Sequence, residues 1–406
     1  MRTIPFFTTS LLLFGITAPV LANSNASQNE AIAEEINDLH NKIAALEKRS
    51  QSSWVDNLKV GAFIQADARY FTDDDTGTDT FLIRRARIDV RGKINNTFSF
   101  RILPEFGDGK NGELLDAYLD WKTSESAALR IGKFKSSIGL ERVQSGSRLL
   151  FLERGLTDNL VPNRDAGIAW NYKTKEQQVT IGIANNAGDR IDAGVDNDDT
   201  KAVYARIYWQ PEYLGGLGIG IASSLAESEL NSSLPTYKTS SRATVFRYNS
   251  DVLRDGKETR VAPHFTYYNG QFGAFGEYVA SSLELTNSQN QQVDITNTAW
   301  QVVASWIVSG EQNSWGGVKP ASDSGAWEVV ARLAELNIDE DVFIAHADAA
   351  RSVSNIRSAT VGVNWHVNNN VKVLVNYEIS DFDNGKSVSL DRLDEKLLSA
   401  RLQLTF

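Results

Sequence analysis

The segment Ser358–Val367 reads SATVGVNWHV and alternates strictly between two kinds of side chain. Its odd-numbered positions carry Ala, Val, Val, Trp and Val, and its even-numbered positions carry Ser, Thr, Gly, Asn and His. Successive side chains of a β-strand point to opposite faces, so this period of two predicts a strand with one apolar and one polar face. The run is about ten residues long, which is the length that a tilted strand needs to cross a membrane.

The same alternation recurs outside this segment, most clearly in residues 371–380 and 395–406. A soluble β-sandwich also alternates, but its strands average about five or six residues. The longer runs therefore favour a transmembrane β-barrel, and counting them predicts an all-β domain at residues 58–406 with sixteen antiparallel strands. The predicted strands are 58–71, 81–94, 97–106, 113–123, 127–134, 166–173, 178–184, 201–209, 216–224, 258–269, 271–281, 293–308, 325–337, 355–367, 371–380 and 395–406.

Connections between these strands should alternate between short turns and long loops, because an even strand number places both barrel ends on the periplasmic side. Segment 309–324 departs from this rule, since it should be a periplasmic turn and yet is long and contains Lys319. We expect it to fold in a defined position. The predicted extracellular loops are 72–80, 135–165, 185–200, 225–257, 338–354 and 381–394.

The first 22 residues have the pattern of a secretory signal peptide. Arg2 precedes an apolar run around Leu11–Phe14, and Val20–Ala22 forms a small-residue cleavage site. We interpret residues 1–22 as a signal peptide that is cleaved after Ala22. The alternative is an N-terminal membrane anchor, but the apolar run is too short to span a bilayer.

A heptad pattern follows at residues 28–50. The apolar residues recur at spacings of four, three, four and three, which predicts a short coiled-coil helix. An amphipathic helix that packs against the rest of the protein is the alternative. The heptad residues are Ile32, Ile36, Leu39, Ile43 and Leu46.

Composition excludes several classes of function. The chain has no Cys, so disulfide frameworks, thiol nucleophiles and Cys-ligated zinc are removed, and we expect neither a metal nor a cofactor. Its formal net charge of −10 argues against a nucleic-acid partner. An outer-membrane enzyme would need a Ser–His constellation at the rim. Because His264, His346 and His366 lie near no obvious nucleophile in the sequence, we predict that the protein is not an enzyme.

Strand parity predicts which charged side chains line the lumen of the barrel. In a barrel the polar face of each strand points inward, and this rule places about thirteen basic residues and eight acidic residues inside. The basic excess in an acidic chain suggests an anion-conducting pore, although pairing of inward Arg with inward Asp is the alternative for each single residue. The inward basic residues are Arg69, Arg85, Arg87, Arg91, Lys93, Arg101, Lys122, Arg130, Arg206, Arg260, Arg332, Lys372 and Arg401. The inward acidic residues are Asp67, Asp89, Glu105, Asp116, Asp120, Glu277, Glu328 and Glu378.

The predicted loop 135–165 strengthens this hypothesis. From Arg130 to Arg164 the chain carries seven basic residues against three acidic ones, Glu141, Glu153 and Asp158. The loop is long enough to fold into the lumen and constrict it, and the planar fork of Arg suits oxyanions. A solvated surface loop is the alternative.

Several stretches occur in the order and spacing of a known family. They include Phe81–Arg87, Asp116–Leu119, Gly132–Lys135, Phe151–Arg154 and Gly325–Glu328. In these stretches the chain resembles the phosphate-selective porin family typified by porins O and P of pseudomonads, a sixteen-stranded trimeric family. The resemblance implies a ladder of arginines that leads anions to a constriction formed by inward-folded loops.

The resemblance also implies the residues of the site. On the barrel wall, Arg84, Arg85 and Asp116 would contact the anion, although parity places Arg84 outward unless a bulge intervenes. Loop 135–165 would supply Arg142, Ser145, Ser147 and Arg154, the long turn would supply Lys319, and loop 225–257 would supply Lys238, Arg242 and Arg247. The lumen ladder would consist of Arg69, Arg87, Arg91, Arg101, Arg206 and Arg332.

Together these observations predict a passive anion-selective porin of the bacterial outer membrane for phosphate or pyrophosphate. The expected partners are inorganic phosphate or polyphosphate as solute, outer-membrane lipid and lipopolysaccharide, and two further copies of the chain in a homotrimer. Two alternatives stay open: a porin of the same fold for another small solute, and a barrel that mainly anchors the envelope through its coiled coil.

Overall fold

The computed structural model describes residues 34–44, 57–73, 77–109, 111–191, 199–383 and 392–406. The chain divides into two units, residues 1–56 and 57–406. In the first unit residues 34–44 are helical, whereas the predicted signal peptide and the remainder of the predicted coiled coil lie outside the described residues. Among the described residues, no helix has both the length and the apolar character that a membrane span requires.

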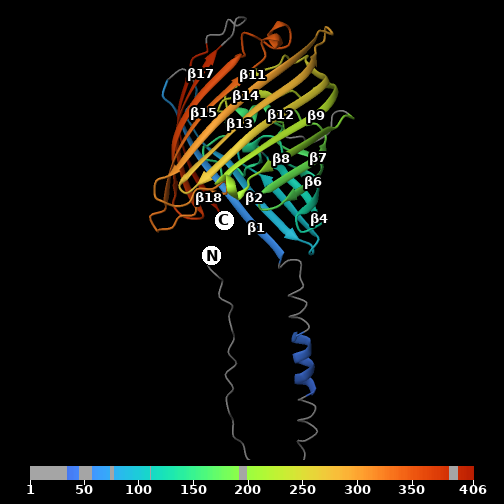
Figure 1. Cartoon of the computed structure of the whole chain (residues 1–406), viewed down its shortest axis with the longest axis vertical. Helices are drawn as coiled ribbons and strands as arrows, with labels where there is room; N and C mark the ends of the chain where they lie inside the picture. Colours follow the sequence, from blue (N-terminus) through green and yellow to red (C-terminus); the bar gives the residue numbers. More distant parts are fainter. Residues whose placement is uncertain (1–33, 45–56, 74–76, 110, 192–198, 384–391) are drawn as a thin grey trace, which may run out of the picture. The chain divides into compact units, whose positions relative to one another are not determined.

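The second unit is a closed antiparallel barrel of sixteen strands, in which each strand pairs with its neighbours along the chain and the first pairs with the last. Figure 1 shows the strands tilted around the barrel, and the fold class predicted from the alternation is confirmed. The barrel strands are β1 (Leu58–Phe71), β2 (Thr80–Lys93), β3 (Phe98–Glu105), β4 (Glu113–Lys122), β5 (Ala127–Phe134), β6 (Asp165–Lys173), β7 (Gln177–Ala184), β8 (Ala202–Trp209), β9 (Leu217–Asn231), β12 (Leu253–Asn269), β13 (Phe272–Thr286), β14 (Gln292–Ile307), β15 (Ala326–Asn337), β16 (Asn355–His366), β17 (Val371–Asp383) and β18 (Glu395–Thr405).

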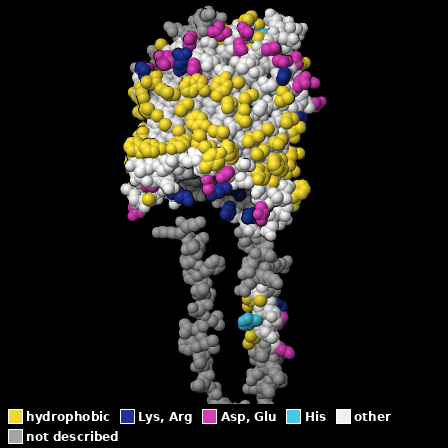
Figure 2. Space-filling view, in the orientation of Figure 1, with side chains coloured by type: hydrophobic (Ala, Val, Ile, Leu, Met, Phe, Trp, Pro, Cys, Tyr) yellow, Lys and Arg dark blue, Asp and Glu magenta, His cyan; other side chains and the backbone are white. Residues whose placement is uncertain are grey.

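Strand β16 illustrates why these residues form a barrel. Val361 and Val363 are exposed on the outer surface, whereas Thr360 and Asn364, which flank them in the chain, are buried on the inner surface. Repeated around the barrel, the outward apolar residues form the broad hydrophobic band in Figure 2, with acidic side chains gathered above it. Such a band is the surface that a barrel presents to lipid.

Three strands extend at least five residues further toward the extracellular side than predicted, namely β9, β12 and β13. The prediction ended β9 at residue 224, but the strand continues to Asn231 through the exposed acids Glu227 and Glu229. Hydrophobic alternation stops at the edge of the membrane, whereas backbone pairing with β12 continues beyond it. The sequence pattern therefore marks the membrane-embedded part of a strand and not its whole length.

An apolar core fills part of the lumen. The hairpin of β10 (Thr236–Lys238) and β11 (Thr244–Arg247) contributes Tyr237 and Phe246, both of which are fully buried. Together with the 3-10 helix η4 (Glu340–Ile344), they pack against inward apolar residues of β13 to β16, such as Leu283. The side of the lumen next to these strands is thus closed by side-chain packing toward the extracellular end.

The loop between β5 and β6, residues 135–164, also lies inside the barrel. It contains α2 (Leu140–Val143) and the 3-10 helix η2 (Leu156–Leu160), and Phe151 packs with Leu140 against Phe275, Val303 and Val330 of the inner wall. Side chains of four inner-wall strands donate hydrogen bonds to its backbone carbonyls. These donors are Gln65 to Gly146 at 2.9 Å, Lys372 to Leu149 at 3.0 Å, Asn364 to Leu150 at 3.0 Å and Arg401 to Leu152 at 2.5 Å.

The long turn between β14 and β15 reaches the same region from the periplasmic end. Trp315 lies edge-on to Phe275 at 5.4 Å between ring centroids, and its carbonyl accepts a hydrogen bond from Gln144 Nε2 at 3.2 Å. The turn and the β5–β6 loop therefore touch inside the lumen. Lys319 of the same turn is exposed.

Candidate functional site

A β-bulge in β2 brings two consecutive arginines into the lumen. In the pairing with β1, Gln65 lies opposite Arg85 and Ala66 lies opposite Ile83, so Arg84 is the extra residue. Strict alternation would send Arg84 into lipid, where a charged side chain costs roughly 2–4 kcal/mol near the midplane. The bulge turns it inward, and both guanidinium groups reach the same carboxylate, that of Glu153.

The bulge is held from behind by the turn that follows β3. Glu105 Oε1 accepts hydrogen bonds from the backbone nitrogens of Ala86 at 2.8 Å and Gly107 at 3.0 Å. A Cβ atom on Gly107 would lie 2.6 Å from the Cα atom of Arg85, so only glycine allows this close approach of two backbones. Contacts to main-chain atoms thus hold the backbone of the bulge in place.

Glu153, in the β5–β6 loop, is the centre of an ion-pair cluster. Its carboxylate accepts from Arg84 Nε at 2.6 Å, from Arg84 Nη2 at 3.1 Å, from Arg69 Nη2 at 2.9 Å and from Arg85 Nη2 at 3.4 Å. Burial by itself would raise the pKa of Glu153, but the charges of Arg84, Arg85 and Arg401 outweigh it and hold that pKa well below its usual range. The carboxylate is therefore anionic.

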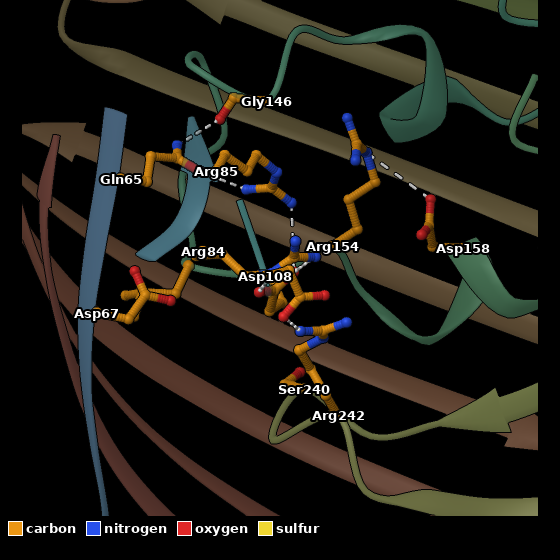
Figure 3. A network of polar contacts seen from close by, with 12 residues as sticks. Gln65, Asp67, Arg84, Arg85, Asp108, Gly146, Arg154, Asp158, Ser240 and Arg242 are labelled. Atoms are coloured by element: carbon orange, nitrogen blue, oxygen red, sulfur yellow. Dashed lines mark hydrogen bonds and ion pairs between the residues drawn. The ribbon is translucent and has the colours of Figure 1, made fainter. Parts of the chain in front are cut away.

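Glu153, Arg84 and Arg85 border a cavity of about 320 Å³, which we call the upper cavity. Figure 3 shows Arg84 and Arg85 approaching it from β2, Arg154 from the β5–β6 loop, and Arg242 from the segment between β10 and β11. Among the residues that the structure describes, ten basic and four acidic side chains line it, which gives a formal excess of six positive charges. They are Arg84, Arg85, Arg87, Lys135, Arg142, Arg154, Arg164, Arg190, Lys238 and Arg242, with Glu105, Asp108, Glu153 and Asp158.

A second cavity, of about 530 Å³, lies toward the periplasmic end and is called the lower cavity. It is bordered by Phe406 and by residues near the start of β1, and its described part is also basic, with seven basic side chains against two acidic ones. Its charged residues are Arg87, Arg91, Arg101, Arg130, Lys135, Arg148 and Arg164, with Asp89 and Asp116.

Three cations border both cavities, namely Arg87, Lys135 and Arg164. Lys135 Nζ donates to the carbonyls of Arg142 at 2.8 Å and Gln144 at 2.7 Å, which holds it at the boundary. Burial, reinforced by the charges of neighbouring arginines, lowers the pKa of Lys135 well below its usual value. Arg164 is oriented by Asp116, whose other oxygen accepts from Arg101 Nη1 at 2.8 Å.

The structure brings most of the predicted site residues to these two cavities. Arg84, Arg85, Arg142 and Arg154 line the upper cavity, while Asp116, Ser145 and Ser147 line the lower one. Of the predicted ladder, Arg87, Arg91 and Arg101 lie along the lower cavity, and Arg87 also borders the upper one.

Five predicted residues lie elsewhere. Arg69 donates to Glu153 and to the carbonyl of Ser241, and Arg332 donates to the carbonyl of Glu153, so both hold loops in place. Arg206 contacts His264 Nε2 at 3.2 Å on the opposite wall, and Lys319 borders neither cavity. Of the three basic residues predicted from loop 225–257, Lys238 and Arg242 line the upper cavity, whereas Arg247 is exposed.

Sequence reasoning missed the roles of three residues. Glu153 and Lys135 lie within the family motifs Phe151–Arg154 and Gly132–Lys135. Nothing in these motifs indicates that Glu153 is the centre of the ion pairs or that Lys135 borders both cavities. Arg190, which follows β7, gave no signal at all. It reaches the upper cavity because its backbone nitrogen bonds to the carbonyl of Val161 and its Nη1 donates to Asn159 Oδ1 at 2.7 Å.

A closed sixteen-stranded barrel with an outer apolar band, a polar lumen and an inward-folded loop is the architecture of an outer-membrane porin. The chain belongs to the phosphate-selective porin O and P family, whose model matches residues 58–406. Its fold and its family place it in the bacterial outer membrane as a channel.

Among curated proteins, porin O of Pseudomonas aeruginosa is 23% identical over 364 residues, which cover 79% of this chain and 82% of that protein. An anion-selective porin from Comamonas acidovorans superposes with a TM-score of 0.53 at 10% identity, covering 86% of this chain and 99% of that one. OmpT of Vibrio cholerae in a trimer form gives 0.54 at 12% identity, with coverage of 86% and 99%. The two structural similarities concern the fold.

Proposed function

We propose that this porin is a passive anion-selective channel for phosphate- and pyrophosphate-type oxyanions. The observation that carries the proposal is the charge of the upper cavity: its described lining has ten basic side chains against four acidic ones, in a chain whose net charge is −10. Acidic residues that gather outside the lumen and basic residues that gather inside it are what an anion pore needs. The family and the anion-selective relative support the same solute class.

In this proposal the β5–β6 loop forms the constriction, and the anion passes from the upper to the lower cavity between Arg87, Lys135 and Arg164. Each arginine offers a planar pair of donors to an oxyanion and keeps its charge at any working pH. Many moderate contacts favour conduction over one deep site, because a permeating ion must also leave. Residues of the two cavities therefore act as a sequence of sites: Arg84, Arg85, Arg142 and Arg154 first, and Asp116, Ser145, Ser147, Arg91 and Arg101 after the boundary.

We further propose that the mature chain begins after Ala22, that it assembles as a homotrimer in contact with lipopolysaccharide, and that residues 28–50 form a coiled coil. Two observations support the assembly. A porin of similar fold was obtained in a trimer form. In helix 34–44 the heptad residues Ile36, Leu39 and Ile43 are each about half exposed. Such exposed apolar residues are what a partner helix would cover in a coiled coil.

The test of the proposed selectivity uses purified porin in planar lipid bilayers. Under a potassium chloride gradient the reversal potential should have the sign of chloride selectivity, and added phosphate or pyrophosphate should reduce the chloride current in a saturable way. Cation selectivity would remove the proposal, and chloride selectivity without block would leave a general anion porin for another small solute.

Arg154→Gln tests the upper cavity directly. Arg154 donates to the carbonyls of Glu141 and Gln144 and pairs only weakly with Asp158. Asp158 also pairs with Arg142, which lies closer. Asp158 therefore keeps a basic partner after the substitution. We expect weaker block by phosphate. Arg357→Gln on the outer surface makes the same chemical change outside the lumen and should leave the block unchanged.

A further inference from the structure

Glu153 has a position that the anion pathway does not require. The wall of the upper cavity would be more basic without it, and yet its carboxylate lies at that wall among four guanidinium groups, those of Arg69, Arg84, Arg85 and Arg401. Its contact with Arg84 is bidentate, with Nε at 2.6 Å from Oε1 and Nη2 at 3.1 Å from Oε2. Two parallel N–H donors to two oxygens is also the arrangement by which arginine binds a phosphate.

The alternative is a purely structural role, in which Glu153 holds the β5–β6 loop against the barrel wall. The loop backbone at this point is already fixed by other groups, however. Leu152 donates from its nitrogen to Asn376 Oδ1 at 2.9 Å and accepts at its carbonyl from Arg401 Nη1 at 2.5 Å, and the carbonyl of Glu153 accepts from Arg332 Nη1 at 3.0 Å. The side chains of Phe151 and Leu152 are buried as well. The carboxylate of Glu153 is therefore not needed to hold the loop, and it can act in the upper cavity.

Charge balance points the same way. Of the four arginines, Arg69 and Arg401 have a second carboxylate, that of Asp67, at 3.1 Å and 2.6 Å. Arg85 donates from Nη1 to Gln65 and has only a long contact, 3.4 Å, with Glu153, so its charge is incompletely balanced. A second anion beside Glu153, or in its place, would find donors from Arg84 and Arg85 already directed toward it.

We propose that Glu153 is a tethered counter-anion, which occupies the oxyanion position of Arg84 and Arg85 when the channel is empty and competes with the permeating anion there. This inference rests on the proposed anion function and adds a rate-setting element to it. While the solute is absent, Glu153 balances the arginines. When the solute arrives, the carboxylate either repels it or is displaced by it. The carboxylate regains its contacts with the arginines as the solute leaves. Glu153 thus prevents the arginines from binding the solute too tightly for its release.

The experiment compares Glu153→Gln with the wild-type channel in planar bilayers, with phosphate as the blocker of chloride current. Loss of the competing charge should lower the phosphate concentration for half-block about tenfold or more, which corresponds to about 1.4 kcal/mol. Exit of phosphate should slow, so the phosphate current itself should saturate at a lower level. Asp120→Asn is the matched control, because Asp120 is a lumen carboxylate in a bidentate pair with Arg130 and borders neither cavity.

The possible outcomes are separable. If phosphate fails to block the wild-type channel, the proposed function falls. If it blocks the wild type and Glu153→Gln shows the same half-block within twofold, or Asp120→Asn shows an equal gain, the tethered counter-anion is refuted while the function stands. Glu153→Asp guards against a folding defect, since it retains the charge and only withdraws it by one methylene. It should give a half-block between those of the wild type and the glutamine variant, and wild-type behaviour would count against the inference.

Discussion

Phe151 provides a test of how the β5–β6 loop is held in the lumen. Its side chain is 1% exposed and packs with Leu140 against Phe275, Val303 and Val330. The guanidinium carbon of Arg332 lies 4.4 Å from the centre of its ring. We expect Phe151→Ala to loosen the loop locally without unfolding the barrel, because the barrel strands are closed by their own backbone hydrogen bonds.

The magnitude follows from the burial. Truncating a fully buried Phe to Ala costs about 3–5 kcal/mol, and the lost contact with Arg332 adds about 0.5–2 kcal/mol. Since 1.4 kcal/mol corresponds to a factor of ten, the summed loss should raise the ratio of released to packed loop by roughly three hundredfold to a hundred thousandfold. The hydrogen bonds from Gln65, Lys372 and Asn364 to the carbonyls of Gly146, Leu149 and Leu150 remain, and they limit the release to the part of the loop that follows these residues.

The assay is single-channel recording in potassium chloride. Phe151→Ala should show open-channel noise and visits to a state of higher conductance that the wild type lacks, together with weaker block by phosphate. Phe81→Ala is the matched control, because Phe81 is 90% exposed on the outer surface of β2. A Phe151→Ala channel with wild-type conductance, noise and block would refute the argument that apolar packing holds the loop.

Three further predictions concern neighbouring groups. Burial and the charge of Arg154 lower the pKa of Lys135, so its positive charge is lost at a lower pH than that of free lysine, whose pKa is about 10.4. Block by sulfate should therefore weaken as the pH rises while still below that value, and Lys135→Gln should remove this dependence. Gly107→Ala would force the β2 bulge to move and should weaken phosphate block several-fold, measured against Gly316→Ala, where an added Cβ meets nothing closer than 3.5 Å. Trp315→Ala removes the ring that packs on Phe275 and should raise the conductance for chloride that enters at the periplasmic end. An unchanged current would show that the turn between β14 and β15 does not narrow the pathway.

The barrel itself could be predicted from sequence because one rule governs it. Every strand residue within the membrane faces either the lipid or the lumen. The alternation seen in Ser358–Val367 therefore recurs in the other strands. The even strand count and the order of turns and loops followed from that pattern. Where the strands continue past the membrane, as β9 does to Asn231, the rule no longer applies and the predicted end was early.

The site was predictable in its residue types and less so in its geometry. A bulge is one inserted residue, and the trace it leaves is two adjacent charges, Arg84 and Arg85, in a strand where one of them would otherwise face lipid. The contacts of Glu153 and Arg190 depend on where loops of more than ten residues return to the wall, which no local pattern encodes. Arg206 and Lys319 show the converse, since an inward parity or a family motif did not bring them to either cavity.

The apolar core beside β13 to β16 gives the two halves of the barrel different tolerance to mutation. Substitutions around Leu283 or Phe246 should behave as they do in the interior of a soluble protein, where volume and shape are constrained. Substitutions of the cavity-lining arginines on the wall made by β1 to β5 change the charge of the lumen and remove no residue of this core. Relatives can therefore diverge in what they transport by altering one side of the lumen, while the other side maintains the fold that they share.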